Sequence, residues 1–218
     1  MPAHYAVSLV LKGRKCVIVG AGAIAERRIE GLLESGAEVV VIGSQATQAV
    51  RQKALAGVVS LIKREYRPGD LNGAFLAIAA TNDRKVNKLI AAEAAAAGTL
   101  LNVVDDPELC VFITPSLLKR GDLTVAISTN GKCPAMARWV REDLEDHFPE
   151  SYEYLVTAAA EARETLKQEG RQIAGEVWNA ALGPVIDQFA SEGEGGKAKQ
   201  ALLRLLRGES EENMVERP

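Results

Sequence analysis

A glycine turn directly after an apolar strand constrains this chain more than any other feature of its sequence. The β-branched run at residues 15–19 (KCVIV) leads into the turn GAGAIA at residues 20–25. In this pattern the first glycine permits a tight bend, the second lets the backbone approach a pyrophosphate, and the small last residue lets a helix pack close to the sheet. The N–H groups that start the helix would bind the phosphates. The predicted cofactor contacts of this turn are Gly20, Gly22, Ala23 and Ile24.

Strands and helices alternate along the rest of the first half of the chain. Apolar runs typical of buried strands are separated by stretches with helical spacing, which predicts an α/β, Rossmann-type, parallel doubly wound sheet. A small α+β region should follow, with a hairpin of strands 111–114 and 123–128 and a helix opened by Pro134. A C-terminal helical domain with a link at 191–196 and a flexible tail should complete the chain. The expected domains are 1–113, 114–147 and 148–218.

The end of the second strand, residues 38–42, indicates which dinucleotide is bound. Ligands of a doubly wound sheet bind outside the carboxyl ends of its strands. An NAD site often carries an acid at the end of this strand to hold the ribose hydroxyls, but here Ser44 and Gln45 stand at that place. Both side chains can bond a ribose more weakly, and no arginine stands at the strand end to favour the phosphate of NADP. We therefore expect NAD as the cofactor.

Composition excludes several other classes of protein. The net charge of −3 gives no basic field for nucleic acid, and no apolar run is long enough for a membrane span. The three scattered cysteines suit reduced thiols in a cytoplasmic protein. With two histidines and no C-x-x-C, no metal cage is expected.

Four motifs in order and spacing give the chain a family resemblance. They lie at residues 12–22, 79–83, 102–107 with 112–116, and 128–134. Together they closely resemble precorrin-2 dehydrogenases, the NAD-dependent enzymes of siroheme synthesis, some of which also act as ferrochelatases, a lyase activity. The resemblance covers roughly residues 5 to 145. The helical remainder resembles the family only in kind.

The resemblance implies a reaction and a catalytic group. Precorrin-2 dehydrogenation removes a hydride and a proton from a reduced tetrapyrrole and yields sirohydrochlorin and NADH. Asp105, the aspartate of the N-V-V-D motif, is the residue that the family implicates in catalysis, and a carboxylate can serve as general base. Asp106 competes for this role. Successive residues of an extended chain point to opposite sides, so we expect only one of the two acids to face the crevice. Alternatively, both acids simply form a turn with Pro107.

The resemblance also implies further contacts. Asn102 would orient Asp105 or contact the substrate, or else only bond the backbone, and Thr81 and Asn82 would line the nicotinamide ribose or form a helix cap. A substrate rich in carboxylates needs local basic groups. The preferred substrate-loop residues are Ser128, Thr129 and Lys132. The other basic residues of this region, which would form either an anion-binding surface or a solvated face, are Lys119, Arg120, Arg138 and Arg141.

The family also implies a homodimer built on the hairpin and the helix after Pro134, with the substrate between this region and the cofactor domain. Ferrous iron would be a second substrate if the chain also inserts metal, and the sequence leaves that open. A regulatory domain that senses NAD without catalysis is the main alternative. A short-chain dehydrogenase is excluded, because no tyrosine has a lysine four residues later.

Overall fold

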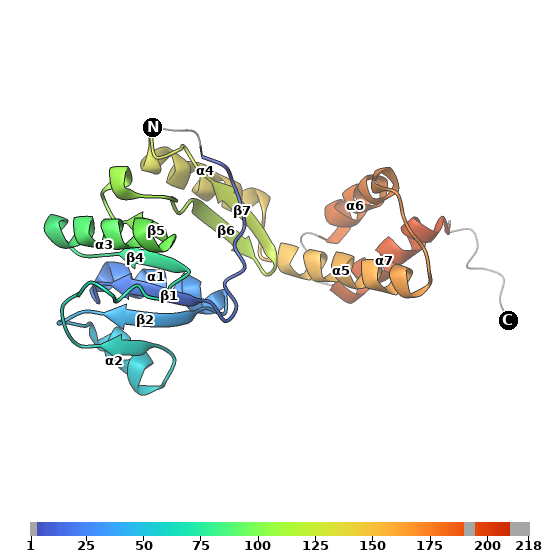
Figure 1. Cartoon of the computed structure of the whole chain (residues 1–218). Coiled ribbons are helices and arrows are strands. Elements are labelled where there is room, and N and C mark those ends of the chain that lie inside the picture. The colour runs from blue at the N-terminus through green and yellow to red at the C-terminus, as the bar shows by residue number, and fades with distance from the viewer. Residues whose placement is uncertain (1–3, 190–194, 210–218) are drawn as a thin grey trace. The chain divides into compact units, whose positions relative to one another are not determined.

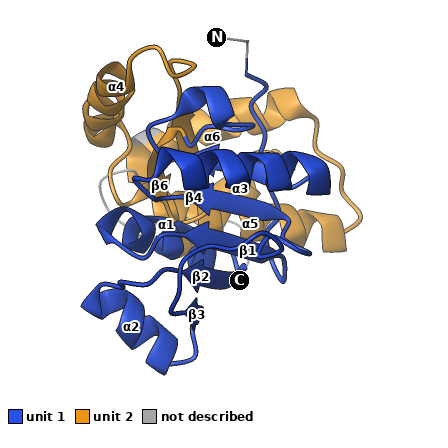
Figure 2. Cartoon of the chain, turned by 60° about the vertical axis from the view of Figure 1, so that its left-hand side comes forward, with its two compact units in different colours: residues 1–114 blue, residues 115–218 orange. Residues whose placement is uncertain are grey.

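The computed structural model describes residues 4–189 and 195–209, and the chain divides into two compact units, Met1–Thr114 and Pro115–Pro218 (Figure 1, Figure 2). The first unit holds a five-stranded parallel sheet in the order β3-β2-β1-β4-β5. Its elements are β1 (Lys15–Val19), α1 (Ala23–Glu34), β2 (Glu38–Ile42), α2 (Gln48–Leu55), β3 (Ser60–Ile62), β4 (Leu76–Ala79), α3 (Arg84–Ala97), β5 (Leu100–Val103) and the 3₁₀ turn η1 (Pro107–Leu109).

Helices cover both faces of this sheet, as alternation along β1 shows. Cys16 and Ile18 pack in a core with residues of α1 and α2, whereas Val17 and Val19 pack in a second core with residues of α3. Successive side chains of a strand point to opposite faces, so a strand buried on both faces must be apolar throughout. The run KCVIV meets that condition. The doubly wound sheet expected from the sequence is confirmed.

Residues 4–14 form no strand. Leu11 is buried in the core beside α1, while Tyr5, Val7 and Val10 are largely exposed. The segment is therefore an arm that one apolar side chain fastens to the first unit.

The second unit begins with an antiparallel hairpin of β6 (Ser116–Arg120) and β7 (Leu123–Ile127). Our prediction that the first hairpin strand is 111–114 was wrong. Those residues continue the loop after β5, where the Val111 N–H donates to the Leu101 carbonyl at 2.8 Å. Helix α4 (Pro134–His147) packs against the hairpin, and it begins at the proline expected to open it.

Three helices form the core of the rest of the second unit: α5 (Tyr152–Gln168), α6 (Gly175–Phe189) and α7 (Gly195–Arg207). Gly195 and Gly196, expected to belong to a link, are the first residues of α7. Residues 191–194 of that link and the tail from 210 lie outside the described residues. The boundary between the two units falls after Thr114, and the further division at 147 stays a prediction. No described helix is long and apolar enough to cross a membrane.

Candidate functional site

The strand order places a ligand crevice at the carboxyl ends of β1 and β4. From β1 the chain winds outward to β2 and β3, then returns to place β4 on the other side of β1. Loops diverge at such a reversal and leave a crevice, which is where doubly wound sheets bind ligands. The glycine turn follows β1, and the segment from Ala80 to Asn82 follows β4.

The glycine turn has the backbone shape that dinucleotide binding needs. Gly20 has φ 108°, and a Cβ there would lie 2.3 Å from the carbonyl oxygen of Ala80. A Cβ on Gly22 would meet no protein atom within 4 Å, so this position faces open space. Gly22 is also the N-cap of α1 and brings no capping side chain, which leaves the first N–H groups of the helix available to a phosphate.

A cavity of about 680 Å³ lies at the carboxyl ends of β4 and β5 and brings together four predicted site residues. Its lining comes from α1, from the turn between β4 and α3, and from the loop after β5. The predicted residues in this lining are Ile24, Thr81, Asn82 and Asp105. Gly20, Gly22 and Ala23 form the neighbouring turn and do not line the cavity.

Both acids of the N-V-V-D-D motif line this cavity, and their partners differ. The Asp106 carboxylate lies 3.5 Å from the Arg84 guanidinium and is 15% exposed. Asp105 is exposed, and its carboxylate has no hydrogen bond or ion pair with any other described residue. The argument that only one acid can face the crevice was wrong. It assumed extended backbone, whereas Asp105 has φ 60°.

Cys110 fastens the loop that carries these acids to the end of β5. Its sulfur accepts the Val103 N–H at 3.1 Å and lies 3.4 Å from the Asp106 carbonyl oxygen, within reach of its S–H. Burial raises the pKa of the Cys110 thiol, so it stays protonated and able to donate. The cysteine is thus an ordinary thiol with a structural task at the site.

Asn102 serves the same loop rather than the cavity. It is 6% exposed, and its amide donates to the Phe112 carbonyl at 3.0 Å. Asn102 does not line the cavity that Asp105 lines. Of the roles left open from the sequence, the structure supports the backbone-bonding one.

The turn between β4 and α3 combines the two roles considered for Thr81 and Asn82. The Thr81 hydroxyl accepts the Asp83 N–H at 2.9 Å, and Asp83 caps α3 through the N–H groups of Lys85 and Val86. Both Thr81 and Asn82 nevertheless line the cavity. Asn87, which the sequence analysis missed, is 5% exposed and holds this turn by donating to the Thr81 carbonyl at 3.2 Å.

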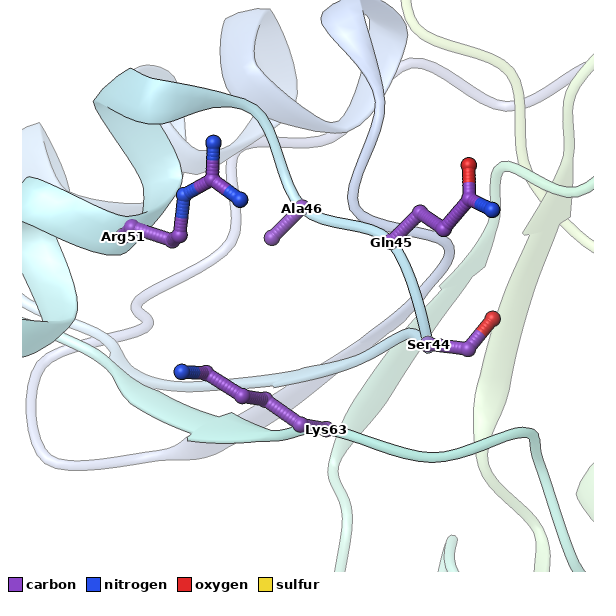
Figure 3. A pocket seen from close by; sticks show the side chains of 5 residues that line it. All are labelled: Ser44, Gln45, Ala46, Arg51 and Lys63. Atoms are coloured by element: carbon purple, nitrogen blue, oxygen red, sulfur yellow. The ribbon is translucent and has the colours of Figure 1, made fainter.

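A second cavity, of about 350 Å³, opens at the carboxyl ends of β2 and β3 (Figure 3). It is lined by the predicted residues Ser44 and Gln45, by Ala46, and by Arg51 and Lys63, which the sequence analysis missed. No arginine stands at the end of β2 itself, but α2 and the segment after β3 bring two basic side chains there (Figure 3). The paired register of Ile42 with Ile62 is the signal that places Lys63 beside the loop after β2.

The predicted substrate-loop residues lie in the second unit, between β7 and α4. The Ser128 hydroxyl accepts the Asn130 N–H at 3.1 Å, and the Thr129 hydroxyl accepts the Cys133 N–H at 3.0 Å. These bonds leave the hydroxyl hydrogens of both residues for another acceptor. The Lys132 side chain is exposed.

Two of the basic residues proposed for an anion-binding surface have protein partners instead. Arg120 donates to the Phe148 carbonyl at 2.6 Å and pairs with Glu150. Arg141 pairs with Glu142 and Glu145. Their charge is partly neutralised, so they are weaker candidates for substrate carboxylates. Among residues 4–189 and 195–209, no three His, Cys, Asp or Glu side chains form a group that could hold a metal ion.

Comparison with known proteins matches this geometry to one family. Residues 7–116 match a family model described as "Putative NAD(P)-binding", and residues 120–147 match one described as "Sirohaem biosynthesis protein central". The siroheme synthases of Methylobacillus flagellatus and Photobacterium profundum are each 35% identical to this chain over 94% of its length. The chain belongs to the siroheme synthase N-terminal-type family. It spans 44% of the length of each of these two relatives.

A solved member of this family has the same fold over nearly its whole length. The structure titled "SirC, precorrin-2 dehydrogenase" is 28% identical, with a TM-score of 0.74, and the match covers 91% of this chain and 98% of that one. The family assignment confirms the resemblance seen in the sequence. The NAD(P)-binding description of the family model also agrees with the nicotinamide dinucleotide expected from the sequence.

Proposed function

We propose that this chain catalyses the NAD-dependent dehydrogenation of precorrin-2 to sirohydrochlorin in siroheme synthesis. The observation that carries the proposal is that an unpaired carboxylate, Asp105, lines the same cavity as Ile24 of the dinucleotide-binding helix. A dehydrogenase needs a proton acceptor next to its hydride acceptor, whereas a sensor of NAD has no use for one. The names of the relatives, synthase and dehydrogenase, also favour an enzyme over a sensor.

The residues of the glycine turn fit a dinucleotide. Open space at Gly22 and the uncapped start of α1 provide a place for two phosphates, and Gly20 packs closely against Ala80 on the other side of the turn. The nicotinamide half of the cofactor would then extend towards Thr81 and Asn82, and it would supply the hydride acceptor.

Asp105 is the proposed general base for the proton that leaves with the hydride. A carboxylate without a protein partner is available to accept a proton, whereas the Asp106 carboxylate already lies 3.5 Å from the Arg84 guanidinium. The same Asp105 carboxylate would relay the pyrrole protons displaced if ferrous iron is inserted. Two carboxylates in one cavity are what favours this second activity.

Substrate carboxylates are proposed to bind the loop between β7 and α4. The hydroxyls of Ser128 and Thr129 can donate, and Lys132 brings a positive charge. Asp105 and these three residues are the proposed catalytic and substrate-binding set.

We further propose a cytoplasmic homodimer. Free thiols at Cys16, Cys110 and Cys133 suit the cytoplasm, and exposed Met136 and Trp139 on α4 suit a subunit interface.

Anaerobic incubation with freshly generated precorrin-2 and NAD tests this function. We expect NADH and sirohydrochlorin to form in equal amounts, followed by absorbance. Faster chelation than the spontaneous control, after ferrous ion is added, would establish the second activity. NAD binding without any turnover would overturn the enzyme and favour the sensor.

A further inference from the structure

The cavity at the ends of β2 and β3 is built into the nucleotide-binding half of the first unit. Its loop is tied to the glycine turn, because the Thr47 N–H donates to the Ala21 carbonyl at 3.0 Å. A Cβ on Gly43 would lie 2.8 Å from the Cβ of Ala21, so this loop and the turn are in close contact. A ligand on the glycine turn would therefore lie next to the loop that lines this cavity.

Two basic side chains line this cavity without a counter-ion. Neither the Arg51 guanidinium nor the Lys63 ammonium has an ion pair or hydrogen bond with any residue in the described part of the chain, and no carboxylate is among the lining residues. Neighbouring basic residues behave differently. Lys53, also on α2, lies 3.8 Å from Glu30, and Arg64 pairs with Asp70 at 2.7 Å.

Side-chain directions separate two parts of the cavity. The Arg51 side chain extends from α2 and the Lys63 side chain from the segment after β3, towards the space between these elements (Figure 3). Ser44 and Gln45 point away from the two basic groups (Figure 3). The cavity thus offers a region of hydroxyl and amide groups and, beside it, a region with two positive charges.

The place of these charges in the fold indicates their ligand. In doubly wound dinucleotide sites, the residue that follows the glycine turn by about 20 positions meets the adenosine ribose, where an acid bonds the 2′-hydroxyl and a nearby arginine accepts a 2′-phosphate. Ser44 occupies that position, and no acid stands there. An arginine and a lysine together suit a phosphate dianion, because the guanidinium donates two parallel hydrogen bonds and the ammonium adds charge.

We propose that Arg51 and Lys63 bind the 2′-phosphate of NADP, so that this chain binds NADP as well as NAD. The inference rests on the proposed function only in that the dinucleotide occupies the glycine turn. Ser44 and Gln45 keep the role of bonding the ribose, which both cofactors share. The 2′-phosphate adds contacts that NAD cannot make.

Titration calorimetry with NAD and NADP tests the proposal. We expect NADP to bind at least as tightly as NAD, and to lose affinity more steeply as salt increases. Arg51→Ala and Lys63→Ala should each lower the affinity for NADP about tenfold and change the affinity for NAD by less than about twofold. Lys53→Ala is the matched control, because it removes a charge from the same helix outside the cavity, and it should leave the ratio of the two affinities unchanged. The fragment 2′,5′-ADP should bind more tightly than 5′-AMP.

Two results would overturn the proposal. One is NAD binding with NADP at least about tenfold weaker. The other is an equal loss for both cofactors in Arg51→Ala and Lys63→Ala. Failure of the proposed function would be seen in the turnover assay instead: precorrin-2 would not be converted although both dinucleotides bind. If neither dinucleotide binds, the glycine-turn site and this inference both fail.

Discussion

Asp105 holds a left-handed backbone conformation at the point where the candidate site needs a carboxylate. A side chain at φ 60° crowds the following carbonyl, and only glycine, asparagine and aspartate adopt this conformation readily. The loop is held there from both sides, by the Cys110 thiol and by the Arg84 pair with Asp106. Backbone strain at such a position is common at functional sites.

Two substitutions at Asp105 should distinguish the effect of losing the carboxylate from the effect of relieving the backbone strain. Asp105→Gly removes the side chain and relieves the backbone, whereas Asp105→Ala removes the same carboxylate and keeps the strain. We expect the glycine variant to be more stable than the alanine variant by about 1 kcal/mol in urea unfolding. Equal stability of the two variants would contradict the strain.

Sequence reasoning identified the residues of this site that stand at strand ends. Thr81 and Asn82 come within three residues of the end of β4, and Asp105 comes two residues after the end of β5, so the topology brings them to one edge. Sequence reasoning missed Arg51 and Lys63 because they belong to α2 and to the segment after β3, which lie further along the chain. Only the pairing of β2 with β3 brings Lys63 to the same place.

At the scale of elements, the glycine turn joins the core to the cofactor site through its two glycines. Gly20 faces protein, with the Ala80 carbonyl in the space of its missing side chain, and Gly22 faces the open side. One glycine therefore serves the fold and the other serves the ligand.

Alanine at these two glycines should give opposite results. Gly20→Ala combines a clash with an unfavourable φ and should lower the free energy of unfolding by at least about 2 kcal/mol. The free energy of unfolding of Gly22→Ala should stay within about 1 kcal/mol of the wild-type value. Its affinity for NAD should fall at least about tenfold, because the added methyl group occupies the space through which the pyrophosphate approaches. Thermal melts and calorimetric titration measure the two effects. A Gly22→Ala variant with unchanged NAD affinity would contradict this assignment.

Strands were predicted correctly where burial alone determined the structure, and incorrectly where local β propensity competed with tertiary contacts. The continuous apolar run of β4 left one interpretation, a strand buried on both faces. The run at 111–114 has similar β propensity, but its backbone is held by Leu101 in the loop after β5. The hairpin strand begins five residues after Val111, at Ser116, so tertiary contacts overrode local propensity.

At the scale of the whole molecule, the second unit has large apolar side chains that are exposed instead of buried in its own core. Leu117 on β6 is 39% exposed, and Met136 and Trp139 on α4 are 53% and 61% exposed. Exposed apolar side chains on a hairpin and on the helix packed against it are available for contact with a partner. This observation supports the proposed homodimer.

Charge placed on this surface should dissociate the dimer. The wild-type chain should show twice its mass of 23.3 kDa in light scattering, and Trp139→Glu should shift it to the monomer mass at micromolar concentration. Leu55→Glu is the control, because Leu55 is 88% exposed on α2 of the first unit and should leave the mass unchanged. A monomeric wild type would refute the dimer.

The central claim is that Asp105 and the glycine turn together form one dehydrogenase site, and single-turnover kinetics test it most directly. The measurement is anaerobic NADH formation from precorrin-2 by the wild type and by Asp105→Asn, with NAD affinity measured in parallel. Asparagine accepts the same left-handed backbone, so the loop should keep its shape. We predict that the variant loses about 10²-fold or more in rate and binds NAD within about twofold of the wild type. A variant that forms NADH at the wild-type rate would contradict the account.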